Sequence, residues 1–156
     1  MRLALYQPEI AGNVGTIIRT CAAFGVAADI VEPCGFPFSD RALARAGMDY
    51  VERASVTRHA DWASFMNAAP GRIVLFSTRA ETALHDFAFT ANDSLLLGQE
   101  SAGVPDAVRD ACAASIRIAM VPGLRSLNVA VAAGIALHEA LRQTGLLNSA
   151  GPAPRG

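Results

Sequence analysis

The residues of this 156-residue chain that could do chemistry lie in three glycine-containing loops. In the first, residues 9–20 read EIAGNVGTIIRT, with Gly12 and Gly15 on either side of Asn13 and with Arg19 further along. Glycines let a backbone come close to a ligand or to a neighbouring chain. Taken alone, this loop favours a plainer interpretation, in which Asn13 caps a helix and Arg19 faces solvent.

The second loop, residues 95–105, reads LLLGQESAGVP and joins an apolar run to a proline that suits the start of a helix. Gly98 and Gly103 lie on either side of Glu100. Two glycines around a carboxylate at the end of a strand suit a loop that binds a small molecule, and a plain tight turn is an equally good interpretation. The spacing matches neither a dinucleotide-binding GxGxxG loop nor a GxSxG nucleophile elbow.

The third loop lies within residues 116–134, which read IRIAMVPGLRSLNVAVAAG. We expect a strand to run into a Pro-Gly turn and Ser126 to cap a long helix, with Asn128 in its first turn. Asn128 is harder to explain structurally, because Asn is a mediocre helix former and its neighbours are apolar. The helix beyond is apolar all round and rich in small residues, which predicts full burial, with a subunit interface as one setting for it.

Composition excludes several other chemistries. The 13 basic residues, all arginine, balance 14 acidic ones, so the chain lacks the lysine of a phosphate-binding P-loop or a Schiff base. This balance also argues against a globally basic nucleic-acid binder. Three cysteines and three histidines are scattered, so we expect no metal, no disulfide framework and a cytoplasmic location. Neither a membrane-spanning run nor a signal peptide is recognisable, so we expect no membrane contact.

An α/β fold must position the three loops, because short apolar runs alternate with helix-type segments. The apolar runs lack polar alternation, which is typical of a parallel sheet covered on both faces, and ligands bind at the carboxyl ends of such strands. We expect one domain over residues 1–145 and a disordered tail over 146–156. The expected strands are 2–6, 29–32, 50–56, 72–77, 94–97 and 116–120, and the expected helices are 14–24, 39–46, 61–68, 105–113 and 126–144.

Taken together and in order, these loops resemble the motifs of the SPOUT superfamily of knotted methyltransferases. The match is closest to the small tRNA 2′-O-methyltransferases that modify the wobble nucleotide, and it extends to about Gln143. Related sequences usually have Ile-Pro-Met where this chain has Ile118, Ala119 and Met120, and often an aromatic residue at His138. The residues that carry the resemblance are PEIAGNVGTIIRTCAAFG, GFPFSDRALARAGMDY, LLLGQESAGVP and IRIAMVPGLRSLNVAVA.

The resemblance implies a mostly parallel α/β sheet with a deep C-terminal trefoil knot, a homodimer, and S-adenosylmethionine as the cofactor. It implies methylation of the ribose 2′-hydroxyl of the wobble cytidine or modified uridine in tRNA, with leucine tRNAs as the expected substrates. Two alternatives remain: an rRNA 2′-O-methyltransferase of the same superfamily, and a non-catalytic nucleotide-binding α/β module. Carried over position by position, the cofactor-binding residues are Phe76, Gly98, Ile118 and Ser126, and the catalytic residues are Asn13, Arg19, Glu100 and Asn128.

The expected reaction depends largely on positioning, because methyl transfer from a sulfonium needs in-line approach and no metal. We expect Arg19 to lie near the cofactor's methyl group, to orient the substrate phosphate and to assist deprotonation electrostatically, since an arginine is an unsuitable free base. Glu100 would hold its loop or orient Arg19, and Asn128 and Ser126 would fix the ribose and the cofactor. Arginines that could bind tRNA phosphates are Arg41, Arg45, Arg53 and Arg58, with Arg19 and Arg125 flanking the site.

Overall fold

The computed structural model describes residues 1–37, 55–69 and 71–149. Within them, seven strands form one sheet in the order β3-β2-β1-β6-β4-β7-β5, and every neighbouring pair is parallel. The strands are β1 (Arg2–Tyr6), β2 (Ala27–Val31), β3 (Val56–His59), β4 (Ile73–Phe76), β5 (Thr82–Ala83), β6 (Ser94–Leu97) and β7 (Ala114–Arg117). The helices are α1 (Ala11–Phe24), α3 (Trp62–Ala68), α4 (Asp106–Asp110) and α5 (Val129–Thr144), with 3-10 turns at Leu84–Asp86 and Leu146–Ser149.

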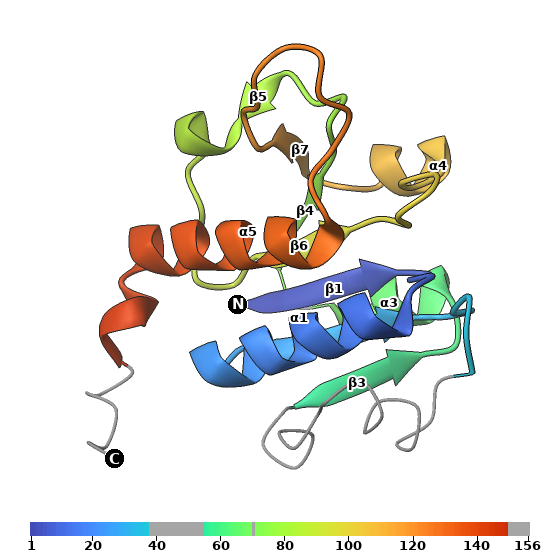
Figure 1. Cartoon of the computed structure of the whole chain (residues 1–156). Helices are drawn as coiled ribbons and strands as arrows, with labels where there is room; N and C mark the ends of the chain where they lie inside the picture. Colours follow the sequence, from blue (N-terminus) through green and yellow to red (C-terminus); the bar gives the residue numbers. More distant parts are fainter. Residues whose placement is uncertain (38–54, 70, 150–156) are drawn as a thin grey trace.

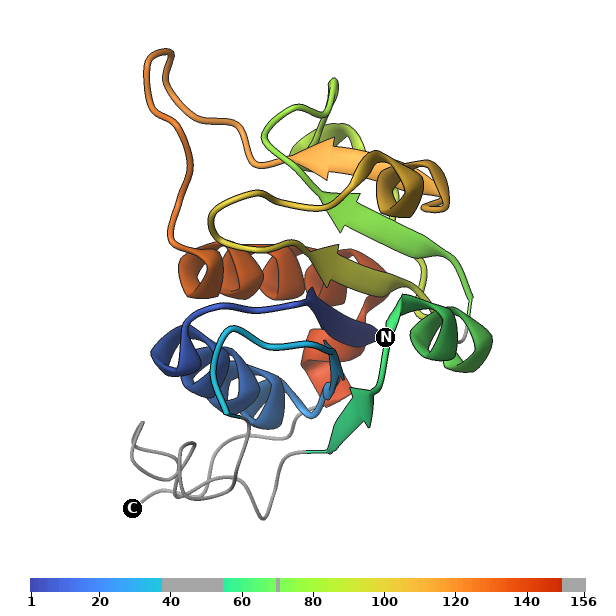
Figure 2. The same ribbon diagram turned by 90° about the vertical axis from the view of Figure 1, so that its right-hand side faces the viewer.

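The sheet separates two hydrophobic cores, because successive side chains of a strand point to opposite faces. Leu3 and Leu5 of β1 pack with residues of α1 and α5, whereas Ala4 and Tyr6 pack with residues of α3 and α4. Figures 1 and 2 show α1 and α5 together on one face of the sheet and α3 on the other. The predicted parallel sheet with helices on both faces is confirmed.

The order of the strands explains why distant loops meet. β6 lies between β1 and β4, and β4 also pairs with β7. All these strands point the same way, so their carboxyl ends lie at one edge of the sheet. The loops after β1, β4, β6 and β7 are therefore neighbours there, although they begin at residues 7, 77, 98 and 118.

Two predicted helix caps are wrong. α1 begins at Ala11, before Asn13, and its cap residue Ile10 makes no side-chain capping bond. α5 begins only at Val129, and its cap is Asn128, whose Oδ1 accepts hydrogen bonds from the backbone N–H groups of Ala130 (2.9 Å) and Val131 (3.4 Å). Ser126 is therefore not the cap but part of the preceding loop. The predicted stop of α5 at Gly145, in the left-handed conformation at φ 72°, is confirmed.

Within a single chain α5 is only partly buried, so its predicted full burial stays a prediction that a subunit interface would have to complete. Ala133, Ala136 and Leu137 are completely buried, whereas Val131 and Ile135 keep 53% and 38% of their surface exposed. One side of the helix packs on the sheet and α1, and nothing in the described part of the chain covers the other side. None of the described helices is long and apolar enough to cross a membrane.

Several element ends differ from the prediction. β7 occupies Ala114–Arg117 rather than 116–120, so Ile118 already belongs to the loop that follows the strand. α4 ends at Asp110, and Ala113 N–H already donates to the Ile73 carbonyl at the start of the pairing with β4. Strand β3 begins at Val56, where the expected strand 50–56 ends. Strand β5 had no recognisable signal because it has only two residues.

Some predictions fall outside the described residues. The expected helix 39–46, most of the expected strand 50–56, and Arg41, Arg45 and Arg53 are among them. Leu146–Ser149 form a 3-10 turn, and Leu146 and Leu147 pack against the core, so the expected disordered tail does not hold for these four residues.

A buried carboxylate in the sheet gives a stability prediction. Asp29 of β2 is 1% exposed, and its carboxylate accepts bonds from Arg2 Nε (2.6 Å) and Nη2 (2.7 Å) and pairs with His59 Nε2 (2.8 Å). Asp29→Asn should lower the free energy of unfolding by about 3 kcal/mol, because it breaks a buried pair on one side only. Urea unfolding measures this change. Glu139→Gln, which breaks the exposed pair with Arg142, is the control and should barely change stability.

Candidate active site

A cavity of about 560 Å³ opens at the carboxyl ends of the central strands. Its walls come from the loops after β4, β6 and β7 and from the first turn of α5, and Ile10 and Asn13 close one side. Ligand pockets typically enclose roughly 300–1,000 Å³, so this cavity is large enough for a nucleoside-sized molecule. It also lies where open parallel sheets commonly bind ligands.

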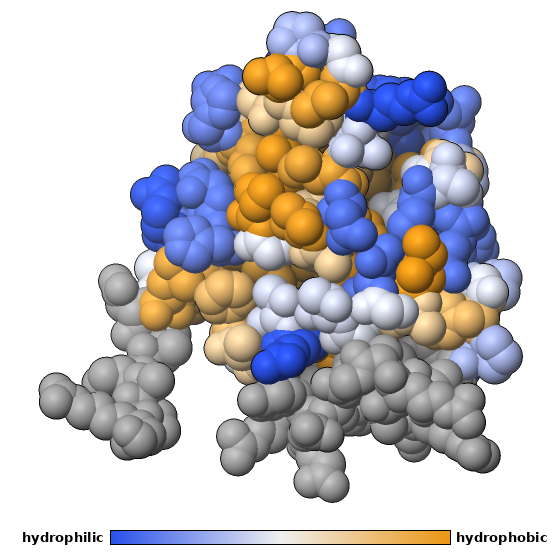
Figure 3. Space-filling model, viewed as in Figure 1, coloured by the Kyte–Doolittle hydropathy of each residue, from blue (hydrophilic) through white to orange (hydrophobic). Residues whose placement is uncertain are grey.

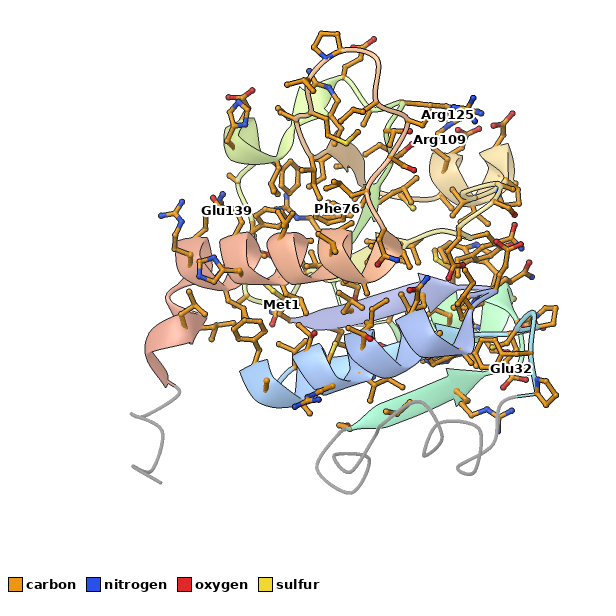
Figure 4. All side chains as sticks on the ribbon, viewed as in Figure 1. Met1, Glu32, Phe76, Arg109, Arg125 and Glu139 are labelled. Atoms are coloured by element: carbon orange, nitrogen blue, oxygen red, sulfur yellow. The ribbon has the colours of Figure 1, made fainter. Side chains whose placement is uncertain are left out.

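All four predicted cofactor-binding residues line this cavity, namely Phe76, Gly98, Ile118 and Ser126. Phe76 ends β4 and is half-buried, and Figure 4 shows it inside the molecule above α5. Together with Ile118 it makes an apolar wall, whereas Ser126 is exposed in the loop that leads to α5. The cavity thus offers an aromatic surface beside polar groups, although the cofactor role of each residue remains a prediction.

The loop after β6 is a tight turn that also lines the cavity, so both interpretations of its glycines apply. Gln99 and Gly103 exchange backbone hydrogen bonds of 2.8 and 2.9 Å. A Cβ atom on Gly98 would lie only 2.5 Å from the carbonyl carbon of Gly103. Gly103 itself has φ +71°, in the left-handed region that favours glycine. Both glycines are therefore required by the shape of the turn.

A chain of hydrogen bonds joins three of the four predicted catalytic residues. Asn13 Nδ2 donates to Glu100 Oε1 (3.2 Å), and Asn13 Oδ1 accepts from Asn128 Nδ2 (3.1 Å). Glu100 Oε2 accepts from the backbone N–H of Glu9 (3.0 Å). The loops after β1 and β6 and the start of α5 are thereby linked side by side at the cavity. Of the two roles expected for Glu100, these bonds show that it holds loops together.

Glu9 is a residue of this edge that the sequence reasoning missed. Its carboxylate accepts hydrogen bonds from Ser101 N (2.8 Å) and Ser101 Oγ (2.7 Å), while its own N–H donates to Glu100. The hydrogen bonds from Ser101 hold the pKa of the Glu9 carboxyl below its ordinary value, so it is ionised at neutral pH. The signal available in the sequence was an acidic residue directly after the first strand and its proline.

Arg19 is not brought to this cavity within one chain. It lies six residues after Asn13 in α1, which places it about 9 Å further along the helix axis and on a different side of the helix. Its side chain is exposed and does not line the cavity. The expected position of Arg19 near the reacting methyl group therefore stays a prediction, and it requires Arg19 to reach the site of another copy of the chain.

Three other arginines line the cavity instead. They are Arg79 in the loop after β4, Arg109 in α4 and Arg125 in the loop before α5, and all three are exposed. Figure 4 shows Arg109 and Arg125 at the same edge of the molecule. Arg125 was predicted beside the site, whereas Arg79 and Arg109 were not. Arg79 is the third residue after β4, and Arg109 lies in α4, so neither is next to a motif.

The described residues contain no cluster of three or more His, Cys, Asp or Glu side chains that could hold a metal. Burial raises the pKa of the Cys21 thiol to about 12 and that of Cys112 to about 11. Both thiols are therefore protonated at neutral pH and are poor nucleophiles.

The sequence matches the model of the SpoU rRNA methylase family over residues 1–138. This chain belongs to that family. The predicted relationship to RNA methyltransferases is confirmed.

Individual relatives are similar over at least 90% of this chain. The tRNA (cytidine(34)-2′-O)-methyltransferase of Beijerinckia indica subsp. indica is 50% identical over 156 residues, covering 98% of each chain. A solved structure that concerns 2-OH methylation of C/U34 on tRNA is 42% identical, with a TM-score of 0.86 over 91% of this chain and 94% of that one. An AdoMet-bound rRNA methyltransferase from Sinorhizobium meliloti is 32% identical, with a TM-score of 0.80 over 90% of this chain and 55% of that one.

Proposed function

We propose that this chain transfers a methyl group from S-adenosylmethionine to the ribose 2′-hydroxyl of nucleotide 34, the wobble position, in tRNA. The observation that carries the proposal is the cavity at the edge of the sheet, which gathers all four predicted cofactor-binding positions and three of the four catalytic ones. Full-length similarity to tRNA (cytidine(34)-2′-O)-methyltransferases supports tRNA as the substrate and disfavours a non-catalytic module.

The residues of the cavity fit the proposed cofactor. Phe76 and Ile118 provide an apolar wall of the kind that a flat purine ring requires. The backbone of the Gly98–Gly103 turn and the exposed hydroxyl of Ser126 provide polar groups on the other sides. When bound, S-adenosylmethionine supplies an electrophilic methyl group on a positively charged sulfur. No metal is needed for this chemistry.

The linked side chains hold the reacting groups in position. Asn128 is fixed at the start of α5 by its capping bonds, and it holds Asn13 through its amide. Glu100 fixes the other end of the Asn13 amide. Such preorganisation raises the rate because no reorientation is needed when the hydroxyl attacks. Arg19 supplies positive charge beside the attacking ribose, and the substrate phosphate or another group takes the proton.

A homodimer would bring Arg19 to the site, and we include it in the proposal. Large apolar side chains are exposed on the face that carries α5 and the loop before it, and Figure 3 shows them gathered there. α1, which carries Arg19, packs directly beside α5. A second copy seated on this face would cover the exposed apolar surface and place its own Arg19 near the cavity. The exposed residues are Val121, Leu124, Val131 and Ile135.

The proposed dimer is tested by introducing a charged side chain on this face. Ile135→Asp should convert the dimer to a monomer, because an aspartate buried without a partner is strongly unfavourable. Light scattering coupled to size-exclusion chromatography measures the mass. Met66→Asp is the matched control, since Met66 is equally exposed on α3, on the opposite face of the sheet. A monomeric wild type, or an unchanged mass for Ile135→Asp, would contradict the proposed interface.

The activity is tested with purified protein, S-adenosylmethionine carrying a labelled methyl group, and unmodified tRNA or rRNA. Mass spectrometry of nuclease digests should find 2′-O-methylated cytidine or uridine at position 34 of tRNA, with leucine tRNAs among the substrates. Methylation confined to rRNA would favour the other proposal for this superfamily. Loss of wobble methylation in a deletion strain is the corresponding test in cells. The C-terminal knot and the cytoplasmic location remain predictions that accompany this proposal.

A further inference from the structure

The described arginines differ in how their charge is balanced. Arg2, Arg58, Arg72, Arg109 and Arg142 each form an ion pair with a carboxylate. No carboxylate among the described residues lies within ion-pair distance of Arg79, Arg117 or Arg125. Two of these three, Arg79 and Arg125, line the same cavity. Within the described part of the chain, two arginines without a carboxylate partner therefore lie together at the proposed active site.

The two arginines are held at this mouth by neighbouring strands. Arg79 is the third residue after the end of β4, and Arg125 lies in the loop that follows β7. β4 and β7 are paired in the sheet, from Val74 with Ala114 to Phe76 with Ile116. Both side chains are exposed, so their guanidinium groups are hydrated and accessible to a ligand that approaches from solvent.

Arg109 lines the same cavity, but its positive charge is balanced by nearby carboxylates. Its Nη1 donates to Asp106 Oδ1 (2.7 Å) and its Nε to Asp110 Oδ1 (3.2 Å), within α4. These carboxylates neutralise its charge and occupy part of its hydrogen-bonding capacity. Arg109 should therefore bind an anion much more weakly than Arg79 or Arg125. It can serve as a control for substitutions of these two arginines.

We propose that Arg79 and Arg125 form a clamp that binds backbone phosphates of the RNA next to the ribose that is methylated. This inference rests on the proposed function, since it takes the substrate to be RNA. A guanidinium binds phosphate oxygens with two parallel hydrogen bonds, which fixes the orientation as well as the position of the strand. Two such groups on separate loops suit consecutive phosphates of an extended strand.

An alternative source of negative charge is the carboxylate of S-adenosylmethionine. That molecule carries one carboxylate together with a positive sulfonium and a positive ammonium group, so two exposed arginines are poorly matched to it. A polyanion is the better match, and it also accounts for RNA binding by a chain with a net charge of −1. The balanced charge of the whole chain is compatible with a local positive site of this kind.

The test uses Arg79→Gln and Arg125→Gln in the full chain, singly and together, with Arg109→Gln as the matched control. Three quantities are measured: KM for tRNA, the Kd of S-adenosylhomocysteine, and the salt dependence of binding to an anticodon stem-loop RNA. Each clamp substitution should raise KM for tRNA by about tenfold. Each should also reduce the slope of log affinity against log salt concentration by roughly 0.7–0.9. Arg109→Gln should leave this slope unchanged.

Specific outcomes separate the possibilities. A weaker Kd for S-adenosylhomocysteine with an unchanged salt slope would assign the arginines to the cofactor's carboxylate and overturn the clamp. An unchanged slope and an unchanged Kd would also overturn it. The proposed function is tested separately. Binding to an oligoribonucleotide of unrelated sequence measures the phosphate contacts and does not depend on methylation. If no tRNA is methylated but the clamp variants lose salt-dependent binding to this oligoribonucleotide, the clamp stands and the tRNA assignment fails.

Discussion

Arg19→Ala should lower kcat for tRNA methylation by about 10²- to 10³-fold while leaving the Kd of S-adenosylhomocysteine unchanged. The expected loss is that of one preorganised positive group acting on a transition state. Cofactor affinity should persist because Arg19 does not line the cavity of its own chain. Steady-state kinetics and calorimetry measure the two quantities. A near wild-type rate would show that Arg19 has no catalytic role.

The same variant tests whether Arg19 acts on the partner's site. Chains that carry Arg19→Ala are co-expressed with chains that carry Gly98→Ala, which should bind the cofactor only weakly. If Arg19 acts across the interface, each mixed dimer has one complete site, made of the cofactor cavity of the first chain and Arg19 of the second. Random assembly should then restore about a quarter of the wild-type rate. If the mixture stays as inactive as its components, Arg19 does not act across the interface.

Gly98→Ala should strongly weaken cofactor binding. The added Cβ would lie 2.5 Å from the carbonyl carbon, 2.6 Å from the carbonyl oxygen and 2.8 Å from the Cα atom of Gly103. These are backbone atoms of the turn, so they cannot move aside as a flexible side chain would. The turn must open, and opening it displaces one wall of the cavity. Calorimetric titration with S-adenosylhomocysteine should show at least a hundredfold weaker Kd, about 2.7 kcal/mol.

The control for this substitution is Gly12→Ala. A Cβ on Gly12 meets nothing within 4 Å, and Gly12 lies in α1 with an ordinary φ, so cofactor affinity should be unchanged. Circular dichroism distinguishes a local effect at Gly98 from unfolding, since the strand and helix content should be retained. Cofactor affinity equal to that of the wild type in Gly98→Ala would mean that the turn is not a wall of the cofactor site.

The alternation of apolar runs with helical segments was enough to predict the parallel sheet and the edge at which its loops gather. The ordered motifs were enough to select seven residues that meet at one cavity. The local sequence pattern did not predict correctly at which residue α1 and α5 begin. Asn13 and Ser126 are both good capping residues by type, yet the caps are Ile10 and Asn128.

The sequence also did not show which residues distant in the chain would lie together at the cavity. Arg79 and Arg109 have no motif around them, and they reach the cavity only because β4 and β7 are neighbours and α4 packs beside them. Arg19 fits a family motif by position, but it does not line the cavity of its own chain. The exposed side of α5 was predicted to be buried because its residues are apolar. The sequence does not show whether the same chain or a second molecule covers them.

The position of β1 in the sheet also bears on how the protein is made. β1 pairs with β2 on one side, but its other neighbour is β6, where Arg2 lies opposite Ser94. α5, which covers this region, ends at Thr144. Contacts of such long sequence separation slow folding. On the ribosome, the first strand therefore has an open edge until more than half of the chain has been translated, and the domain closes only once its last helix has emerged.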